Sequence, residues 1–165
     1  MSQTPSGITL NAASAARARA GQLLLTGLGT LLAVALIATL ASRSGQPLLI
    51  GSFGATCVLL FGFPKGPFSR PRNVIGGHLL CSCTGLACLA LLGPGILPMA
   101  VAAALSVMLM GLTDTTHPPA GGNPIIIFMT LPGWDFALVP TLAGAVLLTA
   151  TAWGYWRLVA FSKRG

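Results

Sequence analysis

The sequence predicts an all-α transmembrane protein made of two helical repeats, each arranged long, short, long. Three observations predict this fold. Of the 165 residues, 54% are hydrophobic and 7% are charged, whereas about 25% are charged in an ordinary soluble domain. Apolar runs of bilayer-spanning length recur along the chain. Shorter apolar runs bounded by proline and glycine lie between them, where a helix cannot continue.

The N-terminal half predicts a tail, a full span, a short segment and a second full span. Residues 1–20 lack an apolar period and contain two arginines, so we expect a cytoplasmic tail. Residues 21–42 are long enough to cross a bilayer. The helical part of residues 47–64 reaches only about 20–25 Å at 1.5 Å per residue, so this segment is either re-entrant or a broken crossing. Residues 73–93 form the next full span.

The C-terminal half repeats this order. Residues 95–113 and 137–159 predict full spans, residues 125–132 are too short to cross alone, and residues 161–165 form a tail. Sliding the chain on itself without gaps superimposes Gly54 on Gly122. We therefore predict a single transmembrane domain over residues 21–160, in which residues 21–93 are the first repeat and residues 95–160 the second.

The basic residues bear on whether the short segments cross. If both cross, the repeats are inverted, and all nine lysines and arginines except Arg43 lie on one side. If both are re-entrant, four spans remain and the basic residues divide almost evenly. The positive-inside rule favours the inverted arrangement with both termini cytoplasmic. In so apolar a chain the net charge of +7 is an orientation signal, and we expect no nucleic-acid partner.

The segment 116–124 is the strongest candidate site. It contains three prolines and two glycines between two apolar runs, so the backbone must break there. Unpaired backbone groups in lipid are tolerated only where protein or a watery cavity satisfies them. A short helix starting near Pro124, with Asn123 as its cap, would point its positive end into the membrane. Inverted repeats would place the equivalent end, near Ser52 and Gly54, opposite it at the midplane.

The chain resembles the HPP family of small integral membrane proteins. The resemblance rests on His117-Pro118-Pro119 followed by Ala-Gly-Gly, on GSFGA at 51–55, and on PRNVIGGH at 71–78. It implies a four-helix or similar transmembrane fold, and it implies nitrite transport, the activity associated with plant plastid and cyanobacterial relatives. Four spans and six passages differ only in the short segments.

We therefore expect a transporter or channel for a small inorganic anion in a bacterial inner membrane, with the lipid bilayer as surroundings and a homo-oligomer left open. A structural or regulatory membrane subunit is the alternative, and a cation or metal transporter the third. His117 could instead only cap the helix break, and His78 could only pack through a hydrogen bond. We expect neither an enzyme, a cofactor nor a metal site. The candidate substrate-binding residues are His117, Pro118, Pro119, Gly121, Gly122, Asn123, Ser52, Gly54, Asn73 and His78.

Overall fold

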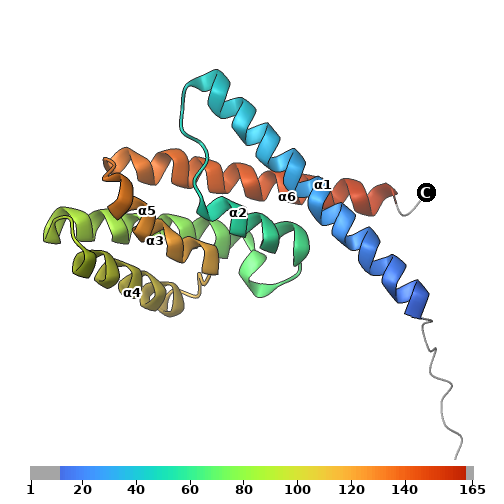
Figure 1. The fold of residues 1–165 in the computed structure, drawn as a ribbon, viewed down its shortest axis with the longest axis horizontal. Coiled ribbons are helices and arrows are strands. Elements are labelled where there is room, and N and C mark those ends of the chain that lie inside the picture. The colour runs from blue at the N-terminus through green and yellow to red at the C-terminus, as the bar shows by residue number, and fades with distance from the viewer. Residues whose placement is uncertain (1–11, 163–165) are drawn as a thin grey trace, which may run out of the picture.

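The computed structural model describes residues 12–162, and within them it contains helices, helical turns and loops but no strand. The predicted all-α class is confirmed. Three helical stretches are long and apolar enough to cross a membrane: Ala12–Ser44, Pro71–Leu92 and Trp134–Ser162. The six α-helices (Figure 1) are α1 (Ala12–Ser44), α2 (Ser52–Cys57), α3 (Pro71–Leu92), α4 (Ile96–Leu112), α5 (Asn123–Thr130) and α6 (Ala143–Ser162).

Helix α1 begins earlier than the sequence pattern predicted. Residues 12–20, which we expected to be part of a non-helical tail, form its first turns and are exposed. This stretch is rich in alanine and arginine, which favour helix by intrinsic propensity even without an apolar face. The remaining parts of the predicted tails, residues 1–11 and 163–165, lie outside the described residues. Helix α1 ends at Gly45, whose φ of +67° is the left-handed conformation typical of a helix end.

The first short segment is half extended and half helical. Residues 45–51 form a loop that contains Pro47, and only then does α2 begin, continued by the π-helical turn Val58–Gly62. The helix from Ser52 to Gly62 is therefore shorter than the predicted 47–64 segment, at about 16 Å for 1.5 Å per residue. Helix α2 starts in the middle of the molecule, between α1 and α3 (Figure 1).

Helix α3 is the central helix and contacts α4, α5 and α6. It starts at Pro71, because proline at the first turn needs no N–H and has the helical φ already fixed. Gly93, with φ of +75°, ends α3 and turns the chain into α4. The Arg72 guanidinium donates a 2.7 Å hydrogen bond to the Thr113 carbonyl oxygen. The start of α3 therefore lies beside the end of α4.

The last predicted span, 137–159, is interrupted near its start. Short helical turns at Trp134–Ala137 and Leu138–Leu142 precede α6, and Val139 within the second turn has extended backbone angles. The residue after it is Pro140, and the proline ring disfavours the helical region for the residue before it. A regular α-helix therefore begins only at Ala143.

The two short helices run in opposite directions from a common centre. Trp156 near the end of α6 donates from Nε1 to the Leu60 carbonyl oxygen, so α2 leads toward the start of α3 and the end of α6. Asn123 donates to the His78 carbonyl oxygen, and a Cβ added at Gly85, further along α3, would lie 2.9 Å from Ile127 Cδ1, so α5 leads toward the end of α3. Whether the two short segments cross the membrane and whether the two halves are related by internal symmetry stay predictions.

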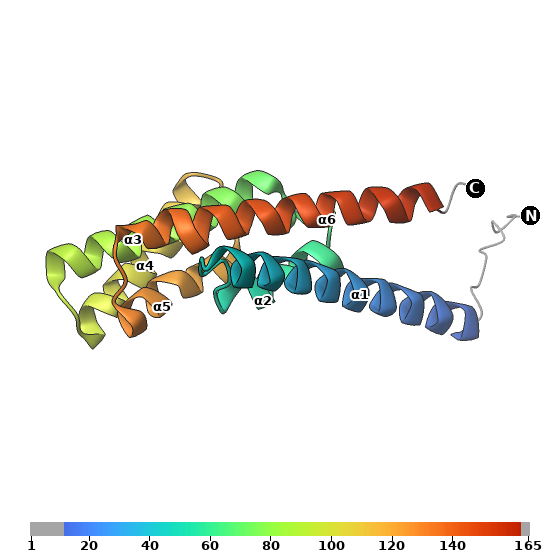
Figure 2. The ribbon, with the colours of Figure 1, turned by 90° about the horizontal axis from the view of Figure 1, so that it is seen from above.

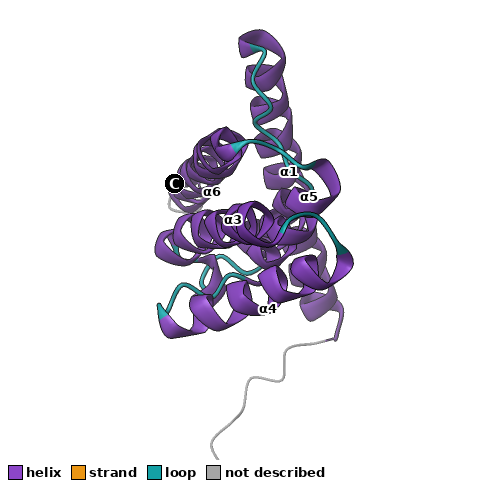
Figure 3. Ribbon diagram, turned by 90° about the vertical axis from the view of Figure 1, so that its left-hand side faces the viewer, coloured by secondary structure: helices purple, strands orange, loops and turns teal. Residues whose placement is uncertain are grey.

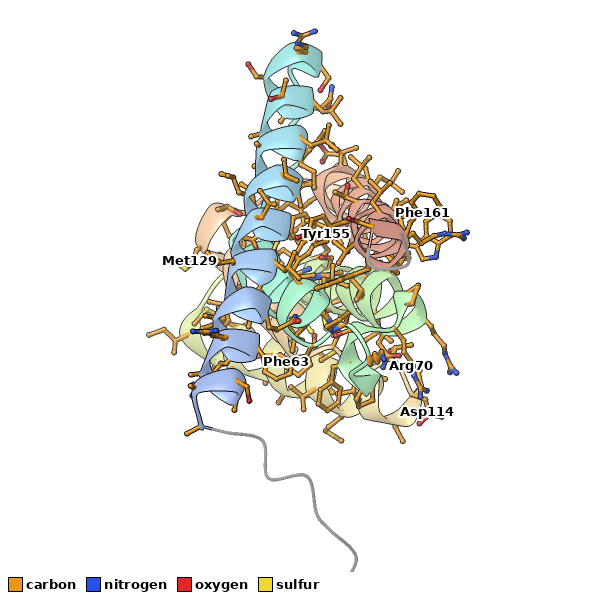
Figure 4. The ribbon with its side chains drawn as sticks, turned by 90° about the vertical axis from the view of Figure 1, so that its right-hand side faces the viewer. Phe63, Arg70, Asp114, Met129, Tyr155 and Phe161 are labelled. Carbon is orange, nitrogen blue, oxygen red and sulfur yellow. The ribbon has the colours of Figure 1, made fainter. Side chains whose placement is uncertain are left out.

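The core lies between the long helices and the short ones. Ile37 of α1, Phe53 of α2 and Leu148 of α6 belong to one buried cluster, and a Cβ on Gly144 would overlap the Phe53 ring. Tyr155 lies between α6 and α1 (Figure 4) and donates to the Leu25 carbonyl oxygen. Helices α1 and α6 lie side by side when seen from above (Figure 2).

The outer surface is apolar. Among the residues pointing outward are Met129 and Phe161 (Figure 4), and the exposed side chains also include Leu24, Leu91, Ile96, Leu112 and Leu158. Seen end-on, α4 lies at one edge of the molecule, and α1 runs from the opposite edge down past the other helices (Figure 3). Contiguous exposed apolar surface on this scale is expected of helices that face lipid.

Candidate functional site

A cluster of buried polar side chains occupies the place where α2, α3 and α5 meet. We call it the polar cluster. All of its members are at least nine-tenths buried, and each makes a hydrogen bond to another member: Ser52, Thr56, His78, Ser82, His117, Asn123 and Thr141. Polar groups at this depth are costly unless they are hydrogen-bonded, so the cluster constrains how the three helices pack.

The first residues of the two short helices meet in this cluster. The Ser52 hydroxyl at the start of α2 donates to Asn123 Oδ1 at the start of α5, over 2.7 Å. The structure therefore places the two helix starts against each other, as the sequence pattern predicted. Since the helices leave this point in opposite directions, the N-terminal ends of both are directed inward.

Asn123 is the centre of the hydrogen-bond network, and its predicted capping role is wrong. Its side-chain nitrogen donates to Ser82 Oγ at 2.9 Å and lies 3.2 Å from Nδ1 and 3.3 Å from the carbonyl oxygen of His78. Gly122 occupies the cap position of α5, and no side chain makes a capping bond there. Asn123 is the first helical residue instead, because its amide is held by α2 and α3 rather than by its own helix.

The two histidines of the chain share one hydroxyl group. Thr56 Oγ1 lies 2.9 Å from Nε2 of His78 and 3.0 Å from Nε2 of His117, and both imidazoles are fully buried. The ring centroids of the histidines are 5.0 Å apart. The sequence suggested no partner for His78, and the structure gives it Thr56 and Asn123.

The second nitrogen of His117 is fixed by the backbone. Nδ1 lies 2.7 Å from the carbonyl oxygen of Phe68, and a carbonyl only accepts, so Nδ1 carries a hydrogen. In neutral His117, Nε2 is then an acceptor facing the Thr56 hydroxyl. The structure thus defines the tautomer of this histidine.

The backbone around His117 explains how the side chain reaches the cluster. His117 has φ of −135° and ψ of 97°, the extended conformation that a following proline favours, and a 3-10 turn begins at Pro118. Gly77 of α3 lies directly against this segment: a Cβ there would be 2.8 Å from the Thr115 carbonyl oxygen and 3.0 Å from His117 Cβ. Asn73 donates from Nδ2 to the Thr116 carbonyl oxygen and so holds the same segment.

Other predicted site residues lie outside the polar cluster. Gly54 is exposed and has no heavy atom within 4 Å of an added Cβ, although its partner in the predicted repeat, Gly122, lies beside Ser52. Pro118 is exposed, and Pro119 and Gly121 are half-buried. These residues shape the break in the backbone and contribute no polar side chain.

Three members of the cluster were not predicted from the sequence: Thr56, Ser82 and Thr141. Thr56 follows Ser52 by four residues and Ser82 follows His78 by four, so each pair shares one helix face. That spacing could have identified both. Thr141 lies in the irregular turn before α6, and no periodicity points to it.

Two hollows lie outside the cluster. One, of about 650 Å³, is lined by Lys65, Ser69, Trp156 and Arg157 and lies between the end of α6 and the loop after α2. The other, of about 550 Å³, lies near Ile50 and Asp135, beyond the end of α5. The loop residue Phe68, which accepts the His117 hydrogen bond, is the neighbour of Ser69 in the first hollow.

Charges lie away from the cluster. Both acidic residues of the chain, Asp114 and Asp135, are exposed. Asp114 and Arg70 appear at the same edge in Figure 4, and the hydrogen bonds of His117 go to Thr56 and Phe68 rather than to Asp114. No group of three or more His, Cys, Asp or Glu side chains suited to a metal ion occurs within residues 12–162.

Comparison with known proteins identifies the family. Residues 15–164 match the transmembrane region of HPP proteins. The chain belongs to the HPP family. Two transmembrane proteins of Dictyostelium discoideum are 40% and 32% identical to it over 112 residues, 63% of this chain. The match covers 39% and 36% of those proteins, so the chain spans well under half their length. No solved structure matches the chain.

The family match and these relatives make the chain a multi-pass membrane protein. Within this HPP protein the residues of the His-Pro-Pro motif have different roles. His117 is fully buried in the polar cluster, whereas Pro118 and Pro119 start the 3-10 turn that leads to α5. The motif therefore combines a buried imidazole with the backbone break that places it.

Proposed function

We propose that this HPP protein transports a small inorganic anion, nitrite, across the bacterial plasma membrane, with both termini in the cytoplasm. The observation that carries the proposal is the contact between Ser52 and Asn123, which joins the inward-directed starts of two opposed short helices inside a buried polar cluster. Breaks in facing helices near the centre of a membrane protein are typical of substrate sites in transporters. The resemblance to nitrite-transporting relatives supports nitrite as the substrate.

The chemistry of the cluster favours an anion over a cation. Its side chains offer hydroxyl, amide and imidazole N–H donors, whereas the only two carboxylates of the chain are exposed. A buried cation requires carboxylate or several carbonyl oxygens around it. The four cysteines are free, and Cys57, Cys81 and Cys88 are buried. No three His, Cys, Asp or Glu side chains lie together within residues 12–162, as a soft-metal site would need.

An anion could pass by exchanging hydrogen bonds. The Ser52 hydroxyl donates to Asn123 Oδ1, and the Asn123 amide donates to Ser82. An oxygen of nitrite arriving between the two helix starts would replace Asn123 Oδ1 as acceptor for Ser52 and would receive the amide hydrogen as well. Because each donor is satisfied before and after, the exchange leaves no buried donor unpaired.

The exposed basic residues would supply the approach to this site. Lys65 and Arg157 line the larger hollow, and Arg70 and Arg72 are exposed on the loop before α3 and at its start. A basic rim raises the local concentration of anions and orients the protein in the membrane.

Uptake of nitrite into liposomes that contain the purified protein tests the proposal. We expect faster uptake than in empty liposomes under the same gradient, and slower uptake when Ser52 is replaced by Ala. Thr39→Ala is the matched control, since its hydroxyl only bonds its own exposed helix. Folded protein that moves neither nitrite, nitrate nor formate would refute transport and support a structural subunit instead.

A further inference from the structure

We infer that Thr56, His78 and His117 form a proton-binding site that accepts one proton, on His117, without losing a hydrogen bond. The inference rests on the positions of three polar atoms around one hydroxyl group. Its consequence, that nitrite and a proton move together, also rests on the proposed function.

The Thr56 hydroxyl can make only a limited number of hydrogen bonds. A hydroxyl donates one hydrogen bond and accepts up to two. Three partners surround Thr56 Oγ1: Nε2 of His78 at 2.9 Å, Nε2 of His117 at 3.0 Å and the carbonyl oxygen of Ser52 at 3.1 Å. The hydroxyl hydrogen can therefore go to only one of them at a time.

In the neutral state one arrangement of hydrogens gives every imidazole nitrogen a hydrogen-bond partner. The Asn123 amide nitrogen is a donor to Nδ1 of His78, so that imidazole carries its hydrogen on Nε2 and donates to Thr56. His117 carries its hydrogen on Nδ1 because of the Phe68 carbonyl, so its Nε2 must accept. Thr56 then donates to His117, and the four groups form one chain of donors pointing toward Phe68.

One added proton can be accommodated by a rotation of one hydroxyl. The lone pair of His117 Nε2 takes the proton, which forms a new N–H bond and makes the ring a cation with both nitrogens as donors. Thr56 rotates its hydrogen to the Ser52 carbonyl oxygen, and its two lone pairs accept from His78 and from His117. The new N–H is the only covalent bond of the protein that changes, the hydrogen bond between Thr56 and His117 reverses its direction, and each of these polar atoms keeps a partner.

A second proton, on His78, would find no hydrogen-bond acceptor. Nδ1 of His78 faces the Asn123 amide nitrogen at 3.2 Å, so a proton there would oppose a donor with a donor. Turning the Asn123 amide over would remove the acceptor that Ser52 uses at Oδ1. The two rings are also only 5.0 Å apart between centroids, and two cations at that distance repel strongly in a buried site.

Within residues 12–162, the groups that face His117 include one other titratable side chain, that of His78. From α2 it faces Thr56, from α3 His78 and Gly77, and from the loop before α3 the Phe68 carbonyl. Among these only His78 is titratable. The charged side chains at the same end of the molecule are directed elsewhere: Arg72 donates to Thr113, and Asp114 is exposed.

The place of the site suggests how it serves transport. His117 reaches the loop next to the larger hollow, where Lys65 and Arg157 lie, while Thr56 and Asn123 link it to the Ser52–Asn123 contact. A proton held on His117 would offset the charge of an anion bound between the short helices. Nitrite would then cross together with one proton, and its uptake would rise with an inward proton gradient.

Nitrogen NMR of the full chain labelled in its two histidines tests the inference without any transport assay. We expect neutral His117 with hydrogen on Nδ1, neutral His78 with hydrogen on Nε2, and, on acidification, one imidazolium signal, assigned to His117 by its absence in His117→Gln. The variant Thr56→Val should lower the population of that cation about tenfold, the size of one lost charge-assisted hydrogen bond, and Thr56→Ser should restore it.

Each outcome supports or overturns a stated part of the proposal. Hydrogen on Nε2 in both neutral rings, equal titration of both rings, or an unchanged cation in Thr56→Val would overturn the proton site, whatever the transport assays show. If the tautomers are as predicted but the rate of nitrite uptake does not depend on a proton gradient, only the coupled movement of nitrite and a proton is overturned. The predicted tautomers in a protein that moves no anion would leave the proton site and remove the proposed function.

Discussion

The Ser52 hydroxyl at the start of α2 donates a 2.7 Å hydrogen bond to the side-chain oxygen of Asn123 at the start of α5, across 71 positions of sequence. This bond joins the starts of the two short helices, which are the two places inside the molecule where regular helix is interrupted. It also connects to both histidines, since Asn123 contacts His78 and Thr56 lies one turn after Ser52. The polar cluster is thus one network rather than several local caps.

Replacing Asn123 with Leu should destabilise the protein substantially. The substitution leaves the Ser52 hydroxyl without its buried acceptor, and it removes the donor to Ser82, which keeps its bond to Thr141. An unsatisfied buried group costs about 1–3 kcal/mol. Thermal unfolding in detergent should therefore show a clearly lower midpoint than wild type. Thr130→Val removes only an exposed bond to Ile126 and serves as the control. An unchanged midpoint for Asn123→Leu would show that the network does not hold the helices together.

Gly77→Ala should displace His117, although alanine is the better helix former. On propensity alone the change in α3 would stabilise the helix by about 0.5–1 kcal/mol. The new Cβ, however, would lie 2.8 Å from the Thr115 carbonyl oxygen, so that segment must move. We expect lower stability and an altered histidine spectrum. Gly121→Ala, where nothing lies within 4 Å, is the matched control and should behave as wild type.

The sequence predicted most of the architecture because the determinants are local. Apolar length placed α1, α3 and α6, and proline with glycine located the breaks before α2 and α5. The two wrongly predicted helix starts, those of α1 and α6, also have local causes. Alanine-rich propensity extended α1 to Ala12 where no apolar pattern exists, and Pro140 delayed the start of α6 to Ala143.

The site was predicted only in part. The segment 116–124 pointed to His117 and Asn123, and the sequence that flanks this segment on both sides is apolar. The partnership of the two histidines through Thr56 could not be predicted, because it joins residues 61 positions apart through tertiary packing. Gly54 was expected beside the substrate by analogy with Gly122, but it faces outward. A shared sequence position in a predicted repeat does not determine which face of a helix turns inward.

Labelling of single cysteines should establish the orientation. The positive-inside rule places the exposed Lys65 and Arg157 in the cytoplasm and Arg43 outside. In a chain without its four native cysteines, Lys65→Cys and Arg157→Cys should react only from the cytoplasmic side and Arg43→Cys only from the outside. Ser69 is a poor reporter, since it is buried and bonded to Leu59 and Phe63. Reaction of Lys65→Cys and Arg43→Cys from one side would refute six passages.

The two histidines should differ in their effect on the pH dependence of nitrite uptake. Both His78→Gln and His117→Gln should slow uptake, because each breaks the bonds around Thr56. Only His117→Gln should also flatten the response to pH, since His117 is the ring that takes the proton. Uptake by both variants is to be measured over the same pH series in liposomes with equal protein content. A flat response in His78→Gln alone would reverse these assignments.

A reversible crosslink between the two helix starts tests most directly whether nitrite passes between them. A Cβ at position 122 would lie 3.9 Å from Ser52 Cβ, within the roughly 3.5–4.5 Å that a disulfide requires. With the native cysteines replaced by alanine, Ser52→Cys combined with Gly122→Cys should form a disulfide on oxidation. Our account predicts that nitrite uptake stops in the oxidised protein and returns to its initial rate after reduction, while neither single variant responds to oxidation. Equal uptake by the oxidised and reduced double variant, with the disulfide shown to be complete, would contradict transport through this site.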